Sequence, residues 1–284
     1  MFAIIGIVVV VVGVFGGFLF EGGPLLVLMQ LGEFLIIGGA AIGSLLISAP
    51  PKLLMKIVEK VIAVFKGTTA NEATYLELLK LLFEVFQMSR KEGLIALEGH
   101  IERPEESVIF QKYPQFISQH HLIAFMCDTF RLIILGGVPA YDMEALMDGD
   151  IDTHHTEGSK PAMLLQKIGD ALPGLGIVAA VLGIIITMQA ISGPPEVIGE
   201  KVAAALVGTF LGILISYGFL QPLATNLELA NDDESKVFEA IKAAIIAFAK
   251  GFNPIVCVEF GRRAIPSELR PSFQAMEDHV KGKK

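Results

Sequence analysis

Two apolar stretches decide the fold of this chain: LPGLGIVAAVLGIIITMQA at Leu172–Ala190 and VAAALVGTFLGILISYGFL at Val202–Leu220. Each is long enough to cross a hydrocarbon layer of ~30 Å as a helix. A polar turn at Ser192–Pro195 joins them, and Pro173 and Pro222 bracket the pair. Neither stretch contains Asp, Glu, Lys, Arg or His. An ion-carrying carboxylate is therefore expected to come from another chain, because intramembrane charges mark ion pathways.

Composition places the chain among polytopic membrane proteins. Hydrophobic residues make up 53% of it, and there is no Trp. Two more apolar stretches lie near the N-terminus: the uncharged Phe2–Phe20 and the shorter Phe34–Ala49, with Glu33 just outside. The first lacks the basic region that opens a secretory signal and is expected to be a retained helix. The sequence thus predicts an all-α fold with four transmembrane helices that are embedded in a lipid bilayer.

Basic residues indicate the orientation. Of 22 Lys and Arg residues, 12 fall in 50–172 and 9 in 225–284, while 21–33 has none. Basic residues favour the cytoplasmic side, so both regions and both termini are expected to be cytoplasmic. The net charge of −8 is spread out, and no basic stripe is present to bind nucleic acid.

Four parts follow along the chain. Residues 1–50 form transmembrane helices 1 and 2, residues 51–171 a helical cytoplasmic domain, residues 172–223 helices 3 and 4, and residues 224–284 a C-terminal helix and tail. Within these parts, helical spacing of apolar residues predicts helices in 75–98, His120–Leu135 and Ser235–Phe252.

Local signals add three finer expectations. Pro104 followed by two Glu residues indicates a helix start. Gly158-Ser159 indicates a loop. The polar tail Glu268–Lys284 is expected to be loosely ordered.

Catalytic motifs are absent from the sequence. It has no Walker A loop, no Gly-x-Gly-x-x-Gly opening a helix and no His-Glu-x-x-His. Cys127 and Cys257 are expected to be reduced and structural. The pairs His120-His121 and His154-His155 are adjacent residues, which a helix points ~100° apart, a poor geometry for one metal. We therefore expect neither an enzyme nor a metal site.

Small residues line both apolar stretches at helical spacing. One face of the helix expected at Val202–Leu220 holds Thr209, Gly212 and Ser216. One face of the helix expected at Leu172–Ala190 holds Gly176, Ala180, Gly183 and Thr187. Two interpretations remain open. Either these residues serve close helix packing, with each hydroxyl bonded back to its own helix, or they form a weakly polar wall beside an ionisable side chain of another chain.

Residues 205–214, Ala-Leu-Val-Gly-Thr-Phe-Leu-Gly-Ile-Leu, with Pro222 behind them, resemble the signature of the MotA family of flagellar motor stator proteins. Residues 173–180 resemble the third membrane helix of that family. Agreement extends over nearly the whole chain, through Arg90, Glu98, and residues 144–148, 258–262 and 270–273.

The resemblance implies a motility and chemotaxis function in the inner membrane of a bacterium. MotA proteins form a homo-pentamer around a MotB dimer, whose membrane helix supplies an ion-binding aspartate, and the ring turns the rotor protein FliG. By position, Pro173 and Pro222 match prolines that couple ion passage to movement. Arg90 and Glu98 match charges that contact the rotor.

The family also implies an ion pathway along Gly176, Ala180, Thr209 and Gly212. Ala180 stands where sodium-driven relatives resemble one another in carrying a hydroxyl group. Its methyl group therefore favours the proton as the coupling ion, with no cofactor.

Two alternatives remain. TolQ and ExbB, which energise outer-membrane processes, resemble MotA in the last two membrane helices but have three spans, which the stretches at 2–49 argue against. A membrane scaffold without ion flux would use the same glycines for packing alone.

Overall fold

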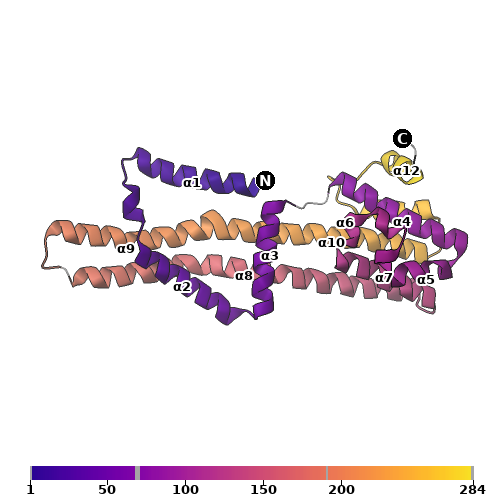
Figure 1. The fold of residues 1–284 in the computed structure, drawn as a ribbon, viewed down its shortest axis with the longest axis horizontal. Helices are drawn as coiled ribbons and strands as arrows, with labels where there is room; N and C mark the ends of the chain where they lie inside the picture. The colour runs from indigo at the N-terminus through magenta and orange to yellow at the C-terminus, as the bar shows by residue number, and fades with distance from the viewer. Residues whose placement is uncertain (1, 68–70, 190, 283–284) are drawn as a thin grey trace. The chain divides into compact units, whose positions relative to one another are not determined.

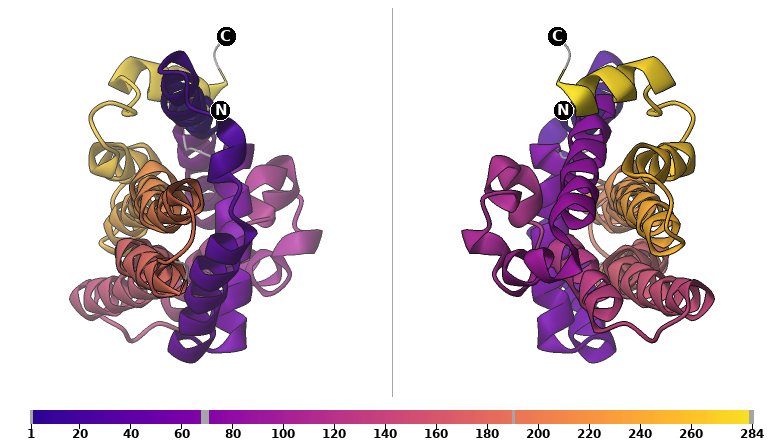
Figure 2. Two further views of the ribbon diagram at one scale, coloured as in Figure 1. Left: turned by 90° about the vertical axis from the view of Figure 1, so that its left-hand side faces the viewer. Right: turned by 90° about the vertical axis from the view of Figure 1, so that its right-hand side faces the viewer.

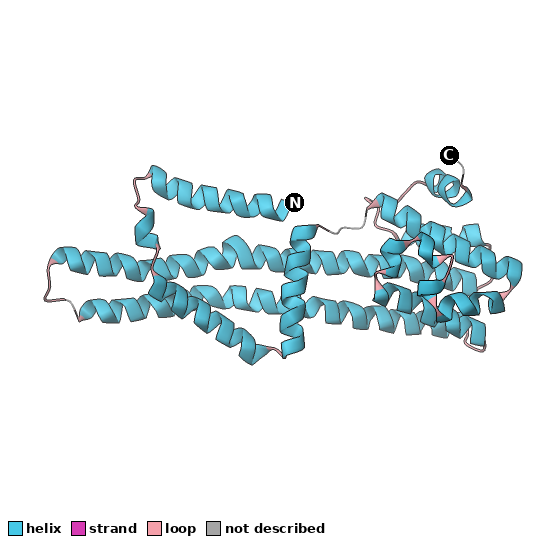
Figure 3. Ribbon diagram, in the orientation of Figure 1, coloured by secondary structure: helices cyan, strands magenta, loops and turns pink. Residues whose placement is uncertain are grey.

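The computed structural model describes residues 2–67, 71–189 and 191–282 (Figure 1). The described residues form helices, turns and loops without a strand (Figure 3), which confirms the predicted all-α fold. The chain divides into two compact units. We call Met1–Thr68 with Gly158–Ala230 the membrane unit, and Thr69–Glu157 with Asn231–Lys284 the helical unit.

The membrane unit contains the predicted apolar helices. Four helices are long and apolar enough to span a membrane: Phe2–Phe20, Leu25–Ser48, Ala140–Met188 and Pro195–Ala249. The elements are α1 (Phe2–Phe20), η1 (Leu25–Leu28), α2 (Leu31–Ser48), α3 (Pro51–Lys66), α8 (Ala140–Met188), α9 (Pro195–Ile215), the π-helical turn η4 (Ser216–Leu220) and α10 (Gln221–Ala249). The predicted four spans are confirmed, although Ala190, the last residue of the expected third stretch, lies outside the described residues.

Three boundaries differ from the prediction. The loop expected at Gly158-Ser159 is wrong, because α8 runs through both residues. Isolated Gly costs a helix only ~1 kcal/mol, which the flanking helix formers offset. The last membrane helix begins at Pro195, before the expected Val202, since proline suits the first helical position. Glu33 lies inside α2, not outside it.

Helices α8 and α9 run side by side in the membrane unit, as Figure 1 and the end-on views of Figure 2 both show. Helix α2 packs on α9, where Ile37 joins Ala179, Val207 and Leu211 in a small buried cluster. Helix α1 has no buried residue. The outer faces of these helices expose large apolar side chains, as helices facing lipid do.

Helix α3 is amphipathic and follows Pro50 and Pro51. Ile57 packs with Ala49 and Leu164 on one side, whereas Met55 and Val58 are exposed. A basic amphipathic helix next to a membrane span is typical of an element that lies at the membrane surface.

The helical unit packs around one large apolar core. Its elements are α4 (Glu72–Glu92), α5 (Leu94–Glu102), η2 (Pro104–Glu106), η3 (Phe110–Lys112), α6 (Pro114–Ile117), α7 (His120–Leu135), α11 (Pro254–Ala264), α12 (Phe273–Lys281), and parts of α8 and α10. Helix α4 is central, with Leu79, Leu82 and Phe86 fully buried, and it contacts α5, α11 and α12.

In this unit, helices were predicted correctly where apolar residues repeat at helical spacing over a long run. Helix α7 has the predicted bounds, and Ser235–Phe252 lies in α10 as far as Ala249. The run at 75–98 is broken at Gly93, whose φ of 88° only glycine adopts readily. Pro104 starts only a 3-10 turn of three residues, and not the longer helix that was expected.

The tail forms a helix, which corrects the expectation of loose order. The Ser272 side chain caps α12 by accepting a bond from the Ala275 amide at 3.1 Å, and Met276 is fully buried. The His279 ring lies 2.9 Å from Glu77 on α4. Sequence polarity misled here, because a short helix needs only a narrow apolar face. Lys283 and Lys284 lie outside the described residues.

A partly buried ion pair fixes the loop before α12. Arg262 donates to both carboxylate oxygens of Glu259, at 2.6 and 2.8 Å, and to the Pro271 carbonyl at 2.8 Å. Arg263 adds a bond of 2.7 Å to Glu259. The Arg262 guanidinium lowers the pKa of the Glu259 carboxyl below its ordinary value. These contacts give a structural reason for the family-like residues at 258–262 and 270–273.

Candidate functional site

The contact between α8 and α9 is made through backbone. A Cβ atom built on Gly176 would lie 2.7 Å from the Gly208 carbonyl oxygen and 3.2 Å from the Gly212 Cα atom. One built on Gly212 would lie 2.5 Å from the Leu172 carbonyl oxygen. Only residues without side chains allow helices to approach this closely. The structure therefore brings together Gly176 and Gly212, two of the predicted site residues.

On the face of α9 that meets α8, Gly208 takes the place that the sequence assigned to Thr209. Ala205, Gly208 and Gly212 face α8, while Thr209 is half-buried beside them. Ala180 is buried on α8, next to Ala179. The Thr187 hydroxyl donates to the Gly183 carbonyl at 2.8 Å, so it is bonded back to its own helix as the packing interpretation expects.

Pro173 does not end a helix; it lies inside α8. Proline has no amide hydrogen, so the carbonyl four residues earlier, at Gly169, loses its usual partner. The Ser216 hydroxyl donates to this carbonyl at 2.6 Å, and Ser216 is fully buried. A side chain of the η4 turn thus replaces the bond that Pro173 removes from α8.

Pro222 follows the same turn. The residue before it, Gln221, donates to Asp170 at 2.9 Å and to the Ser216 hydroxyl at 3.3 Å. Pro222 itself is exposed, in the first turn of α10. Both prolines thus lie within continuous helical segments, because α8 continues through Pro173 and η4 leads directly into α10 at Pro222.

Glu33 is a residue that sequence reasoning missed. Its side chain is buried against Gly183 of α8 and Gly208 of α9. The predicted apolar stretch begins at Phe34, which leaves Glu33 just outside it. The signal available was a lone acidic residue beside an apolar stretch, which in a membrane helix points to function.

The two predicted rotor-contact residues lie in the helical unit. Arg90 is exposed at the end of α4 and donates to the Phe252 carbonyl at 3.1 Å. Glu98 is exposed on α5. Both charges are accessible to a partner, and Arg90 also holds the loop that follows α10.

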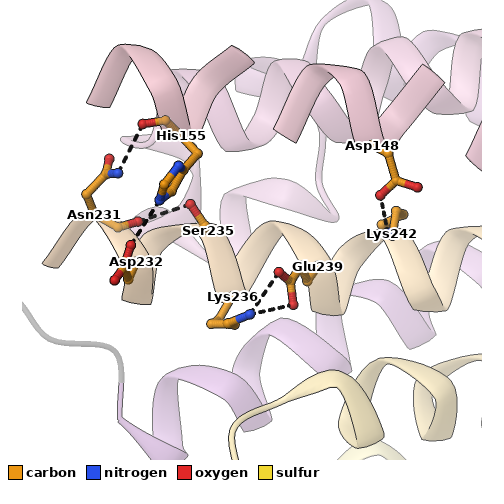
Figure 4. Close-up of polar contacts among 8 residues, drawn as sticks. All are labelled: Asp148, His155, Asn231, Asp232, Ser235, Lys236, Glu239 and Lys242. Atoms are coloured by element: carbon orange, nitrogen blue, oxygen red, sulfur yellow. Dashed lines mark hydrogen bonds and ion pairs between the residues drawn. The ribbon is translucent and has the colours of Figure 1, made fainter. Parts of the chain in front are cut away.

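Several polar contacts of the helical unit join α8 to α10, as Figure 4 shows. The His155 ring lies 2.9 Å from Asp232, and Asn231 donates to the His155 carbonyl at 3.1 Å. Lys242 pairs with Asp148. Across the described ranges, no three His, Cys, Asp or Glu residues are arranged to hold a metal.

Both cysteines are buried free thiols. Burial raises the pKa of Cys127 to about 12 and that of Cys257 to about 11. Neither is a thiolate at neutral pH, so neither is poised as a nucleophile.

Comparison with known proteins identifies the family of this chain. The family model described as motility protein A N-terminal matches residues 4–93, and that of the MotA/TolQ/ExbB proton channel family matches residues 118–240. Motility protein A of Escherichia coli is 40% identical over 284 residues, which cover 100% of this chain and 96% of the relative. The chain belongs to the motility protein A family.

Other motility protein A relatives agree. The protein from Salmonella typhimurium is 39% identical over 99% of this chain and 95% of its own length. The structure of the flagellar MotAB stator complex from Bacillus subtilis has a TM-score of 0.75 at 24% identity, and the match covers 99% of this chain and 98% of that chain. Motility protein A membership makes this chain a flagellar stator subunit with membrane-spanning helices. The match at residues 4–93 also favours it over the TolQ or ExbB alternative.

Proposed function

We propose that this motility protein A chain, with a MotB dimer, couples proton flow across the bacterial inner membrane to torque on the rotor protein FliG. The contact of α8 with α9 carries the proposal. It joins two apolar helices backbone to backbone through Gly176 and Gly212. It also bonds the Ser216 hydroxyl of the η4 turn to the Gly169 carbonyl, the group that Pro173 leaves without its helical partner. A wall of this kind, in which the carbonyl that Pro173 leaves unpaired is bonded to the neighbouring turn, can respond to the charge state of an aspartate on the partner.

The finer roles follow from this proposal. A homo-pentamer would surround the MotB dimer, with both termini in the cytoplasm and no enzymatic activity or cofactor. Gly176, Ala180, Thr209 and Gly212 line the ion pathway, Pro173 and Pro222 couple it to movement, and Arg90 and Glu98 face FliG. Moving one proton through 100 mV supplies ~2.3 kcal/mol.

Deletion of the gene in its source cell tests the function. We expect filaments that assemble but do not turn, with swimming restored by a plasmid copy. Normal swimming in a strain that lacks every other stator gene would refute the proposal.

The coupling ion is tested in the same rescued strain. Swimming speed is expected to follow the proton-motive force and to be unchanged when sodium is removed, because Ala180 offers no oxygen ligand to a dehydrated sodium ion. A requirement for sodium would overturn the proton assignment.

A further inference from the structure

Glu33 is a carboxyl group buried among apolar helices. It lies in the first turn of α2, and only 7% of its surface is exposed. Its Oε2 atom has no hydrogen-bond partner among the described residues. An ionised carboxylate in such a place costs several kcal/mol unless a cation or donor reaches it.

Two glycines leave room for this carboxyl group. A Cβ atom on Gly208 would overlap Oε2, and one on Gly183 would lie 3.4 Å from Oε1. The same built atoms would lie 3.0 Å from the Ala179 Cβ atom and 2.8 Å from the Ala205 Cβ atom. The carboxyl group therefore occupies a notch on the line where α8 meets α9.

The charged groups on the surrounding elements are few. Helix α2 has no other ionisable residue, α1 and η1 have none, and α8 has none from Ala171 to Met188. Helix α9 carries Glu196, Glu200 and Lys201 in its first two turns. Among the described residues, no ion pair joins Glu33 to Lys201 or to another basic side chain.

The notch suits a proton better than a metal cation. Hard metal ions need several oxygen ligands, whereas the hydroxyl nearest along α8, that of Thr187, is bonded to the Gly183 carbonyl. A proton needs a single oxygen, and Oε2 offers one. Thr209 directly follows Gly208, so the notch adjoins the wall assigned to the ion pathway.

We infer that Glu33 is a proton-binding residue of this chain, located where α2 begins, towards the end of the membrane unit that carries the turn between α8 and α9 (Figure 1). The inference rests on the proposed function for the direction of flow. A hydronium ion gives its proton to the carboxylate and leaves as water. The carboxylic acid then gives that proton to a water molecule on the way to the partner's aspartate and returns to the carboxylate.

Infrared spectroscopy tests the binding site itself. The probe is the full complex in proteoliposomes, with a partner whose membrane aspartate is replaced by asparagine so that its own carboxyl band is absent. We expect the C=O band of a protonated carboxylic acid, which weakens as the pH rises and is lost in E33Q. The control E196Q, an exposed carboxyl on α9, should keep it, and so should K201Q. An unchanged spectrum in E33Q would overturn the inference, as would loss of the band in K201Q.

Motor measurements test the role of this site in proton flow. A proton-transfer group changes the rate of ion passage and not the energy per ion. In E33Q, low-load rotation should slow at least twofold. A positioned proton-transfer group contributes a factor of ~10²–10⁴ to its own step, so its loss makes that step slow enough to limit the speed. Stall torque per stator should stay the same. An equal fall in both quantities would indicate a structural role and refute the inference. If instead even the wild-type chain failed to restore rotation while the band persisted, the proposed function would fail and the proton site would stand.

Discussion

Replacing Gly176 with alanine should push α8 and α9 apart. The new Cβ atom would lie 2.7 Å from the Gly208 carbonyl oxygen, whereas ordinary contact begins at 3.4 Å, so the helices must separate locally by about 0.7 Å. The same substitution at Gly212, whose Cβ atom would lie 2.5 Å from the Leu172 carbonyl oxygen, needs about 0.9 Å. Backbone is the obstacle in both cases, and backbone cannot change rotamer.

The expected cost follows from this overlap. Overpacking of a close-packed interior destabilises by about 1–3 kcal/mol, which is roughly a 5–150-fold change in an equilibrium constant. Because Gly176 and Gly212 face each other, one separation relieves both clashes. The double variant should therefore cost less than the sum of the single variants.

Heating the purified complex and measuring the fraction that elutes intact from a sizing column gives the comparison. Gly174→Ala is the matched control, since it lies two residues away on α8 and its Cβ atom would meet nothing within 4 Å. We expect Gly174→Ala to behave as wild type and Gly176→Ala to dissociate at a lower temperature. Equal midpoints for these two variants would refute the packing argument.

Three further predictions concern polar groups. Ser216→Ala should destabilise the complex by about 1–3 kcal/mol, because it leaves the carbonyl freed by Pro173 unpaired. The control in the same heating assay is Thr225→Ala, which removes an exposed hydrogen bond of 3.1 Å. Equal losses of stability in the two variants would contradict this account. Reversing both exposed charges, Arg90→Glu with Glu98→Lys, should impair torque in tethered cells more than the amount of membrane-assembled stator, and undiminished rotation would count against a rotor contact. The lowered pKa of Glu259 adds stability that is present above the ordinary carboxyl value of 4.5 and is lost as the pH falls through the folded value; the melting difference between wild type and Glu259→Gln should therefore shrink in acid, and a constant difference would show that the pair contributes no pH dependence.

Long periodic signals made most of the fold predictable. The uncharged run of α1, the α8–α9 pair and the amphipathic α7 each carry their signal over four turns or more. Shorter signals failed, because one glycine or a few polar residues do not outweigh packing. Helix α8 passes through Gly158, and the polar segment after Ser272 folds into α12 once Met276 finds a place in the core.

The candidate site was predictable only as a list of residues. Sequence indicated that Gly176 and Gly212 are suited to close packing, and the structure places them in contact. It could not show that Gly208 shares that contact line with Glu33, since the two residues are far apart in the chain and only the packing of α2 on α8 and α9 joins them. The expectation that an ion-carrying carboxylate comes from another chain rests on only two helices, those at 172–190 and 202–220. A third helix, α2, supplies a buried carboxyl group of this chain.

The bond between Ser216 and Gly169 explains how two distant prolines can act together. Pro173 removes a bond within α8, and the vacant carbonyl is taken by a side chain from the turn that leads into Pro222. Gln221 extends this link from the Ser216 hydroxyl to Asp170, back on α8. If α8 were to bend at Pro173, the distance between the Gly169 carbonyl and the η4 turn would change. Such a movement must either break this bond or carry α9 and the start of α10 along. A buried unpaired carbonyl costs about 1–3 kcal/mol, comparable to the ~2.3 kcal/mol that one proton supplies over 100 mV. Under the proposed proton coupling, this bond therefore favours movement of both helices together over rupture of the contact.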